Sequence, residues 1–139
     1  MNKVKYLLTY RYSEIIHDLT VEFVKIYVLN NPNGLNRLGS RRDYRTADQM
    51  NQAARSGKQN IVEGVGQERT SEKGIIKLLG VANASFEELL TDFEDFLRQN
   101  HLEIYPKENL RITKFRKIAY RLSNLGNLSS SIIFWINHK

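Results

Sequence analysis

Residues 45–66 constrain the fold of this chain more than any other stretch, because helical periodicity coincides there with small residues on one face. The inward-facing positions recur at intervals of three and four residues: Ala47, Met50, Ala54, Gly57, Ile61 and Gly64. This spacing places them on one side of a helix. Small side chains let a neighbouring helix approach closely, since the distance between packed helices depends on the side chains at the contact. We therefore predict a helix that packs against other helices.

Three further segments have the apolar periodicity of amphipathic helices. The expected inward residues of the first are Tyr12, Ile16, Leu19, Phe23 and Ile26, and Ile15 and Tyr27 widen this apolar stripe. Those of the third are Ile75, Leu79, Ala82, Phe86, Leu89, Phe93 and Phe96, with a second row of Ile76, Leu90 and Leu97. Those of the fourth are Phe115, Ile118, Leu122, Leu125, Ser129, Ile132 and Ile136. No stretch alternates with period two, so no strands are expected.

These patterns predict an all-α chain with a single domain over residues 1–139. The expected helices cover about residues 10–30, 44–64, 71–101 and 108–136. Capping residues are available at the starts, with Thr9 or Ser13 for the first helix, Asp43 for the second and Ser71 for the third. Four amphipathic helices with three connections predict an antiparallel up-down four-helix bundle.

The charge of the chain is positive and unevenly distributed. The net charge is +6, and residues 104–139 carry seven Lys/Arg against one acidic residue, whereas residues 64–103 are net negative. A basic surplus favours phosphate-bearing partners. The competing interpretation is that the acidic middle faces the basic C-terminal segment. No cysteine, signal peptide or membrane-length apolar run is present, and we expect a cytoplasmic protein without a membrane partner.

Catalytic patterns are weak. None of the three histidines has a partner at metal-ligand spacing, and Glu14 with His17 is a single Glu-x-x-His copy that we interpret as a solvated helix face. The acidic run Glu87, Glu88, Asp92 and Asp95 has the same interpretation. We expect no catalytic residues, no metal, no cofactor and no enzymatic activity.

Polar residues on the second helix carry the remaining signal. Asn60 and Glu63 lie beside the small-residue face, where an unsatisfied buried polar group would cost about 1–3 kcal/mol. We interpret them as part of a hydrogen-bond network or subunit contact; the alternative is a ligand site. The full set of expected structural or oligomer residues is Gln49, Gln52, Asn60, Glu63 and Gly64.

Two motifs resemble a known family, the four-helix-bundle proteins encoded in intervening sequences of bacterial 23S rRNA genes. They are the Asn-Ile-x-Glu-Gly motif at residues 60–64 and the Ala-x-x-Ser-x-x-Glu-Leu pattern at residues 82–89. Residues 48–59 resemble a subgroup known as the four-helix-bundle suffix domain. The resemblance covers roughly residues 45–97. The chain has Ser-Gly-Lys-Gln at residues 56–59 where many members have Ser-Ile-Pro before the Asn, which removes a proline kink.

The resemblance implies a homo-oligomer, with a ring-shaped pentamer as the expected form, and no catalytic residues. It also implies kinship with the basic accessory proteins of diversity-generating retroelements, which bind a reverse transcriptase and nucleic acid. Our principal hypothesis is a nucleic-acid-associated adaptor that contacts RNA or DNA backbones. Its candidate binding residues are Arg41, Arg42, Arg45, Arg55, Lys58 and Arg69. The alternatives are an oligomeric protein-interaction scaffold without a nucleic-acid role and an accessory subunit of a reverse transcriptase.

Overall fold

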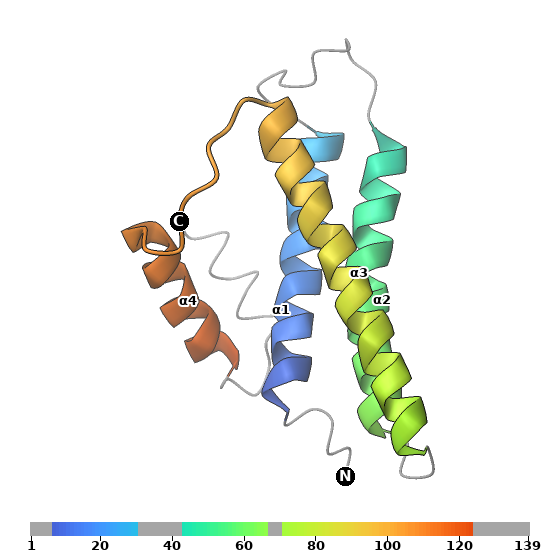
Figure 1. Cartoon of the computed structure of the whole chain (residues 1–139). Helices are drawn as coiled ribbons and strands as arrows, with labels where there is room; N and C mark the ends of the chain where they lie inside the picture. Colours follow the sequence, from blue (N-terminus) through green and yellow to red (C-terminus); the bar gives the residue numbers. More distant parts are fainter. Residues whose placement is uncertain (1–6, 31–42, 67–70, 124–139) are drawn as a thin grey trace.

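The computed structural model describes residues 7–30, 43–66 and 71–123, and these residues form four helices and no strand (Figure 1). The helices are α1 (Leu8–Phe23), α2 (Tyr44–Gly66), α3 (Glu72–Gln99) and α4 (Leu110–Ser123). A π-helical segment, η2 (Val24–Leu29), continues α1 and ends with a hydrogen bond from Asn30 N to Lys25 O at 3.2 Å. The all-α prediction is confirmed.

Three of the helix starts use the side-chain caps that such positions favour. The Asp43 carboxylate accepts a hydrogen bond from Thr46 N at 3.0 Å, and the Ser71 hydroxyl accepts one from Gly74 N at 3.2 Å. The α4 start is stabilised by Asn109, whose side-chain oxygen accepts from Arg111 N at 2.9 Å. The predicted caps of the second and third helices are therefore confirmed.

The predicted cap of the first helix is wrong. α1 begins at Leu8, after an N-cap residue Leu7 that has no side-chain capping bond. Ser13 lies inside the helix and is buried, and its hydroxyl donates to Tyr10 O at 2.6 Å. A hydroxyl that bonds a carbonyl of the preceding turn is satisfied within a helix, so Ser13 does not mark the helix start.

α2 is the central helix of the described structure, and its inward face is the predicted one. The buried residues of α2 are Ala47, Met50, Ala53, Ala54, Gly57, Ile61 and Gly64. Its backbone approaches both α1 and α3, whereas α1 and α3 do not approach each other at backbone distance. Small residues on α2 thus let two helices pack against it closely.

Aromatic side chains fill the space between α1 and α3. The Phe23 ring lies 4.9 Å from the rings of both Phe93 and Phe96, with edge-to-face geometry in each case. These pairs pack against the core cluster that contains Met50 and Leu89. Edge-to-face pairs of this kind add to the stability that burial provides.

The inward face of α1 differs from the predicted one. Ile16, Ile26 and Tyr27 of the predicted stripe are exposed, whereas Ile15 of the same stripe is buried. The other deepest positions of α1 and η2 are Ser13, Thr20, Val24 and Val28. The Thr20 hydroxyl is satisfied by donating to Ile16 O at 2.7 Å. Periodicity alone gave too much weight to large residues, whereas a closely packed face also admits small hydroxyl residues that bond their own backbone.

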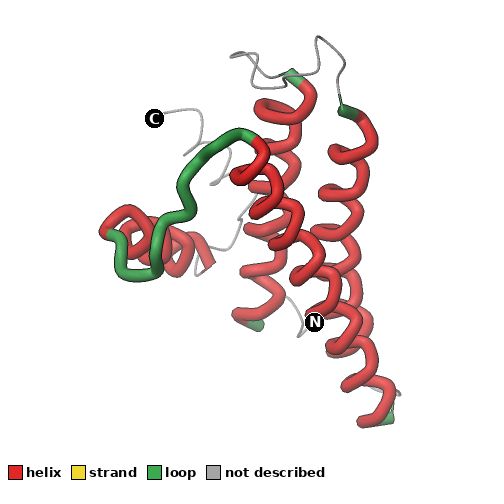
Figure 2. Tube along the Cα trace, turned by 45° about the horizontal axis from the view of Figure 1, so that its top comes forward, coloured by secondary structure: helices red, strands yellow, loops and turns green. Residues whose placement is uncertain are grey.

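α4 is set apart from the other three helices (Figures 1 and 2). Among the described elements it contacts α1 alone, where Leu122 packs beside Ile15, Tyr12 and Leu19. The predicted continuation of this helix to about residue 136 lies outside the described residues. None of the described helices is long and apolar enough to cross a membrane.

Candidate nucleic-acid interface

α4 is the most basic of the described helices. It carries five cations and no acidic residue: Arg111, Lys114, Arg116, Lys117 and Arg121. All five are exposed. A helix with one sign of charge and no acidic neighbour of its own creates a positive surface potential that attracts anions.

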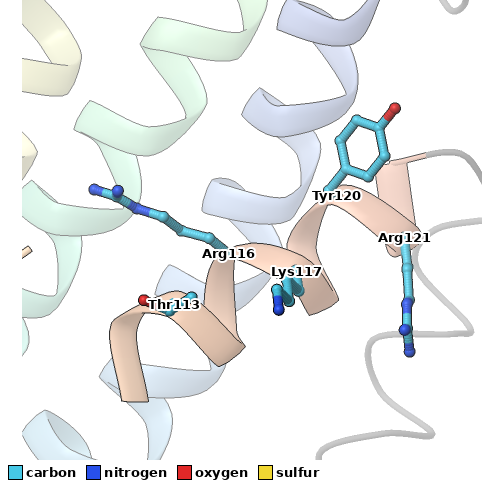
Figure 3. A pocket seen from close by; sticks show the side chains of 5 residues that line it. All are labelled: Thr113, Arg116, Lys117, Tyr120 and Arg121. Carbon is cyan, nitrogen blue, oxygen red and sulfur yellow. The ribbon is translucent and has the colours of Figure 1, made fainter. Parts of the chain in front are cut away.

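Part of this basic surface forms a hollow of about 470 Å³. The described residues of its lining all belong to α4: Thr113, Arg116, Lys117, Tyr120 and Arg121 (Figure 3). The side chains of Arg116 and Arg121 extend in different directions from the helix, and the Tyr120 ring stands away from the ribbon. We call these five residues the α4 basic surface.

The sequence of α4 explains how this surface is presented. Thr113, Lys117 and Tyr120 follow one another at spacings of four and three residues, so they share one side of the helix. The half-buried residues Ile118 and Leu122 occupy other positions, and Leu122 packs against the α1 cluster. The apolar side of α4 therefore rests on α1 and leaves the cations to the solvent.

Contacts before α4 help to fix its first turn. The Arg111 guanidinium donates a hydrogen bond to the Tyr105 hydroxyl at 2.6 Å and lies 5.3 Å from the centroid of the same ring. This cation–π contact joins α4 to the connection that leads out of α3. Arg111 thus has a structural partner that the cations of the α4 basic surface are not shown to share.

The structure does not gather the candidate cations of the second helix into one patch. Arg45 and Arg55 are exposed, whereas Lys58 is half-buried. Arg45 and Lys58 are thirteen residues apart in α2, which corresponds to about 20 Å along the helix axis. Arg41, Arg42 and Arg69 lie outside the described residues.

Lys58 and Arg55 instead face a polar cluster on α1. Burial lowers the pKa of His17 from its ordinary value, and the positive charges of Lys58 and Arg55 lower it further. Burial raises the pKa of Asp18. His17 Nδ1 and Asp18 Oδ2 are buried without a hydrogen-bond partner among the described residues. The interpretation of His17 as part of a solvated helix face is therefore wrong.

The Asn60 region forms a polar network between α2 and α3. Asn60 Nδ2 donates to Ser56 O at 2.9 Å and to the Ser56 hydroxyl at 3.3 Å. The hydroxyls of Ser56 and Ser85 are hydrogen bonded at 3.0 Å, and Ser85 Oγ also lies 3.0 Å from Val81 O. The network joins the two sequence motifs across the helix interface, as expected of residues that fix register.

The other motif residues divide between surface and core. Gln49, Gln52 and Glu63 are exposed, so Glu63 does not form a buried pair with Asn60. Gly64 is buried against α3, where a Cβ would lie 3.3 Å from Leu78 Cβ. A close helix contact thus accounts for Gly64, and the described structure gives the exposed residues no internal role.

The acidic helix α3 does not neutralise α4 in the described structure. These two helices share no backbone contact among the described residues, and the ion pair between Arg98 and Asp95, at 2.8 Å, lies within α3. Burial, Glu88 and Asp95 raise the pKa of Asp92. The described residues contain no cluster suited to a metal ion.

Comparison with known proteins gives no match: no family model, curated protein or solved structure is similar to this chain. The site must therefore be judged from its own chemistry. The sequence interpretation did not include Arg116, Lys117, Tyr120 or Arg121 among the candidate binding residues. The available signal is the basic excess of residues 104–139, which the sequence alone does not assign to a binding site, because a facing acidic helix explains it equally well.

Proposed function

We propose that this chain is a non-enzymatic, nucleic-acid-associated adaptor of the 23S rRNA intervening-sequence family, and that it binds through the α4 basic surface. The observation that carries the proposal is the exposure of five cations on a helix with no acidic residue and no contact with acidic α3 among the described residues. The two sequence motifs support the family assignment.

The proposed contacts are with phosphates. Lysine and arginine that neutralise phosphates release counterions, so affinity falls steeply as salt rises. Phosphate contacts position a protein on nucleic acid without reading its sequence. We therefore expect binding to RNA and DNA with little sequence preference.

The test compares two variants that each lose three positive charges. Arg116→Gln/Lys117→Gln/Arg121→Gln removes the cations of the α4 basic surface, and Lys25→Gln/Lys73→Gln/Lys77→Gln removes exposed lysines outside α4. Fluorescence anisotropy with labelled single-stranded RNA is measured over a salt series. For the α4 variant we expect weaker binding and a slope of log K against log salt that is shallower by up to about 2.

The lysine control should bind nearly as the wild type does. Equal losses in the two variants would indicate a general charge effect and contradict a site on α4. If the wild type is not retained by RNA or DNA even at low salt, the nucleic-acid role itself fails.

We also propose that the chain assembles into a ring-shaped homo-oligomer of antiparallel up-down bundles. The short interval between the end of α2 at Gly66 and the start of α3 at Glu72 supports an antiparallel pair. An exposed apolar row on α3 supports the assembly: Ile76 is 71% exposed and Leu90 is 52% exposed. A protein-interaction scaffold, or a subunit that accompanies a reverse transcriptase, would use the same surface.

Charge favours contact between this row and the α4 of another copy. Glu87 and Glu94 are exposed neighbours of Leu90 on α3, at three and four residues from it. The first turns of α4 expose Leu110 and Phe115 next to basic residues. A contact between two different surfaces of the same chain generates a closed ring when the rotation that relates successive copies closes on itself.

A further inference from the structure

The two most exposed large apolar side chains among the described residues lie on helices of opposite charge. Leu110 of α4 is 76% exposed, and Ile76 in the apolar row of α3 is 71% exposed. α4 carries five cations and no acidic residue. In the row of α3, by contrast, Leu90 has Glu87 and Glu94 as exposed neighbours. Each helix therefore presents apolar side chains beside charges of one sign.

Leu110 shares one side of α4 with two cations of the α4 basic surface. Spacings of four, three and four residues connect Leu110, Lys114, Lys117 and Arg121. Such positions are neighbours along one side of a helix, and the Lys117 and Arg121 side chains lie on the same side of the α4 ribbon (Figure 3). We call these four residues the Leu110 row. Leu122, through which α4 packs on α1, is not among them, so the contact with α1 uses a different side of the helix.

The Leu110 row matches the apolar row of α3 in spacing and in charge. Lys114 lies four residues from Leu110, and Glu94 lies four residues from Leu90. Both separations correspond to about 6 Å along the helix axis. When the two leucines pack together, the lysine of one helix therefore meets a glutamate of the other. Glu87 lies three residues before Leu90, so a glutamate is in reach whichever way the helices run. The contact proposed above, between α3 of one copy and α4 of the next, is thus centred on the Leu110 row.

We propose that nucleic acid and a second copy of this chain compete for α4, so that the binding of either one weakens the binding of the other. The inference rests on the proposed nucleic-acid binding and assembly, and it specifies how the site is regulated. Lys117 and Arg121 belong both to the Leu110 row and to the α4 basic surface. A cation that is covered by the acidic α3 of another copy is not available to neutralise a phosphate.

A closed ring occupies every α4. Each copy contributes one row of α3 and one α4 to the contacts, and closure leaves no end at which an α4 is exposed. Nucleic acid therefore binds only after a contact between copies opens. Linkage makes the effect reciprocal, and coupling between two sites is roughly 5- to 150-fold in affinity. Nucleic acid should weaken the assembly by the same factor by which assembly weakens nucleic-acid binding.

The experiment uses the full chain at low salt and a labelled single-stranded RNA too short to join several copies. RNA is titrated into each protein at a concentration at which the wild type is assembled. Fluorescence anisotropy measures RNA binding, and light scattering measures the mass of the protein. The variants are Leu110→Gln on α4, Ile76→Gln/Leu90→Gln on α3, and the control Leu102→Gln. Leu102 is 45% exposed and lies in the connection between α3 and α4.

The added RNA should reduce the mass of the wild type towards that of a monomer. Both row variants should be monomers and should bind RNA roughly 5- to 150-fold more tightly than the assembled wild type, because no other copy covers their cations. None of the substitutions changes the charge, so a general electrostatic effect cannot produce this gain. Leu102→Gln should match the wild type. Circular dichroism checks the helices, and the α3 variant carries the test if Leu110→Gln loses its fold.

Two results would overturn the inference and leave the proposed function standing. One is an assembly that keeps its mass while RNA saturates it, because α4 would then serve both partners at once. The other is an RNA affinity that is unchanged in row variants that have become monomers. A wild type that binds no RNA would instead refute the nucleic-acid role, and a wild type that is always a monomer would refute the assembly. The inference fails with either of them.

Discussion

The Phe86 ring of α3 lies directly over Gly57 of α2. A Cβ built at position 57 would be 2.5 Å from Phe86 Cζ, which is closer than real Cβ contacts. The glycine is therefore needed to make room for the ring, although glycine has a poor helix propensity. Gly57 has less room than Gly64, where an added Cβ would lie 3.3 Å from Leu78 Cβ.

Gly57→Ala should destabilise the fold. The added methyl group must displace the half-buried Phe86 ring, and overpacking of this kind costs about 1–3 kcal/mol, partly offset by up to about 1 kcal/mol of helix propensity. We expect a lower midpoint of urea unfolding, followed by circular dichroism. The matched control is Gly80→Ala in α3, where no atom lies within 4 Å of the added Cβ.

Gly80→Ala should stabilise the protein by about 0.5–1 kcal/mol, because only the propensity gain remains. The two alanine variants thus shift the unfolding midpoint in opposite directions. A stabilising Gly57→Ala would show that Phe86 does not lie against α2.

The Ser56–Ser85 hydrogen bond should contribute measurable coupling between α2 and α3. Ser85 is 8% exposed, so its replacement by alanine removes a bond worth about 0.5–1.5 kcal/mol. A double-mutant cycle of Ser56→Ala and Ser85→Ala, measured by urea unfolding, isolates the pair. Strictly additive effects of the two substitutions would mean that the hydroxyls do not interact.

His17 should make folding stability depend on pH near neutrality. Its pKa is lowered in the folded state from 6.5 by burial and then by Lys58, with Arg55 acting in the same direction. Below about pH 6.5 His17 is protonated in the unfolded chain to a greater extent than in the folded chain. The contribution of His17 to the free energy of unfolding is therefore present above pH 6.5 and is lost as the pH falls below that value.

The measurement is the urea midpoint between about pH 7.5 and about pH 5.5, compared with His17→Gln, which cannot titrate in this range. The raised pKa of Asp18 acts in the opposite sense, stabilising the folded state as pH falls, but in a window closer to its ordinary 3.8. An identical pH profile in the wild type and the variant would contradict the buried placement of His17.

The apolar row of α3 should control self-association. Ile76→Gln/Leu90→Gln removes two exposed apolar side chains without changing charge, so a monomer is expected where the wild type is an oligomer. Light scattering measures the mass, and circular dichroism checks the fold. Lys73→Gln/Lys77→Gln on the same helix should leave the mass unchanged. A wild-type monomer, or an oligomer that survives the row substitution, would count against this interface.

Sequence patterns were sufficient for the parts of the fold that local chemistry controls. The caps at Asp43 and Ser71 each depend on one side-chain oxygen that bonds a backbone N–H three residues later. Such caps can therefore be recognised from the local sequence. The face of α2 was also predictable, because a run of small residues at helical spacing has few alternative uses. The same reasoning failed on α1 and on the second row of α3, because size was taken as a guide to burial and the exposed Ile16, Ile76 and Leu90 were placed inside.

The candidate site could not be predicted in the same way. Whether Arg116 and Lys117 face acidic α3 or solvent depends on where a separate helix packs, and no local pattern contains that information. The polar surroundings of His17 likewise arise from Lys58 and Arg55, about forty residues away in the chain. Titration and surface potential depend on such long-range neighbours.

The sequence by itself therefore determined that the chain is helical, the caps at Asp43 and Ser71, and the close-packing face of α2, since these follow from backbone bonding and side-chain size within a few turns. Only the tertiary structure decided that Phe86 is the residue over Gly57, that Ser56 meets Ser85, and that α4 rests on α1 with its cations exposed. These relationships join positions far apart in the chain. These contacts contribute to the free energy of folding only once the helices are packed together.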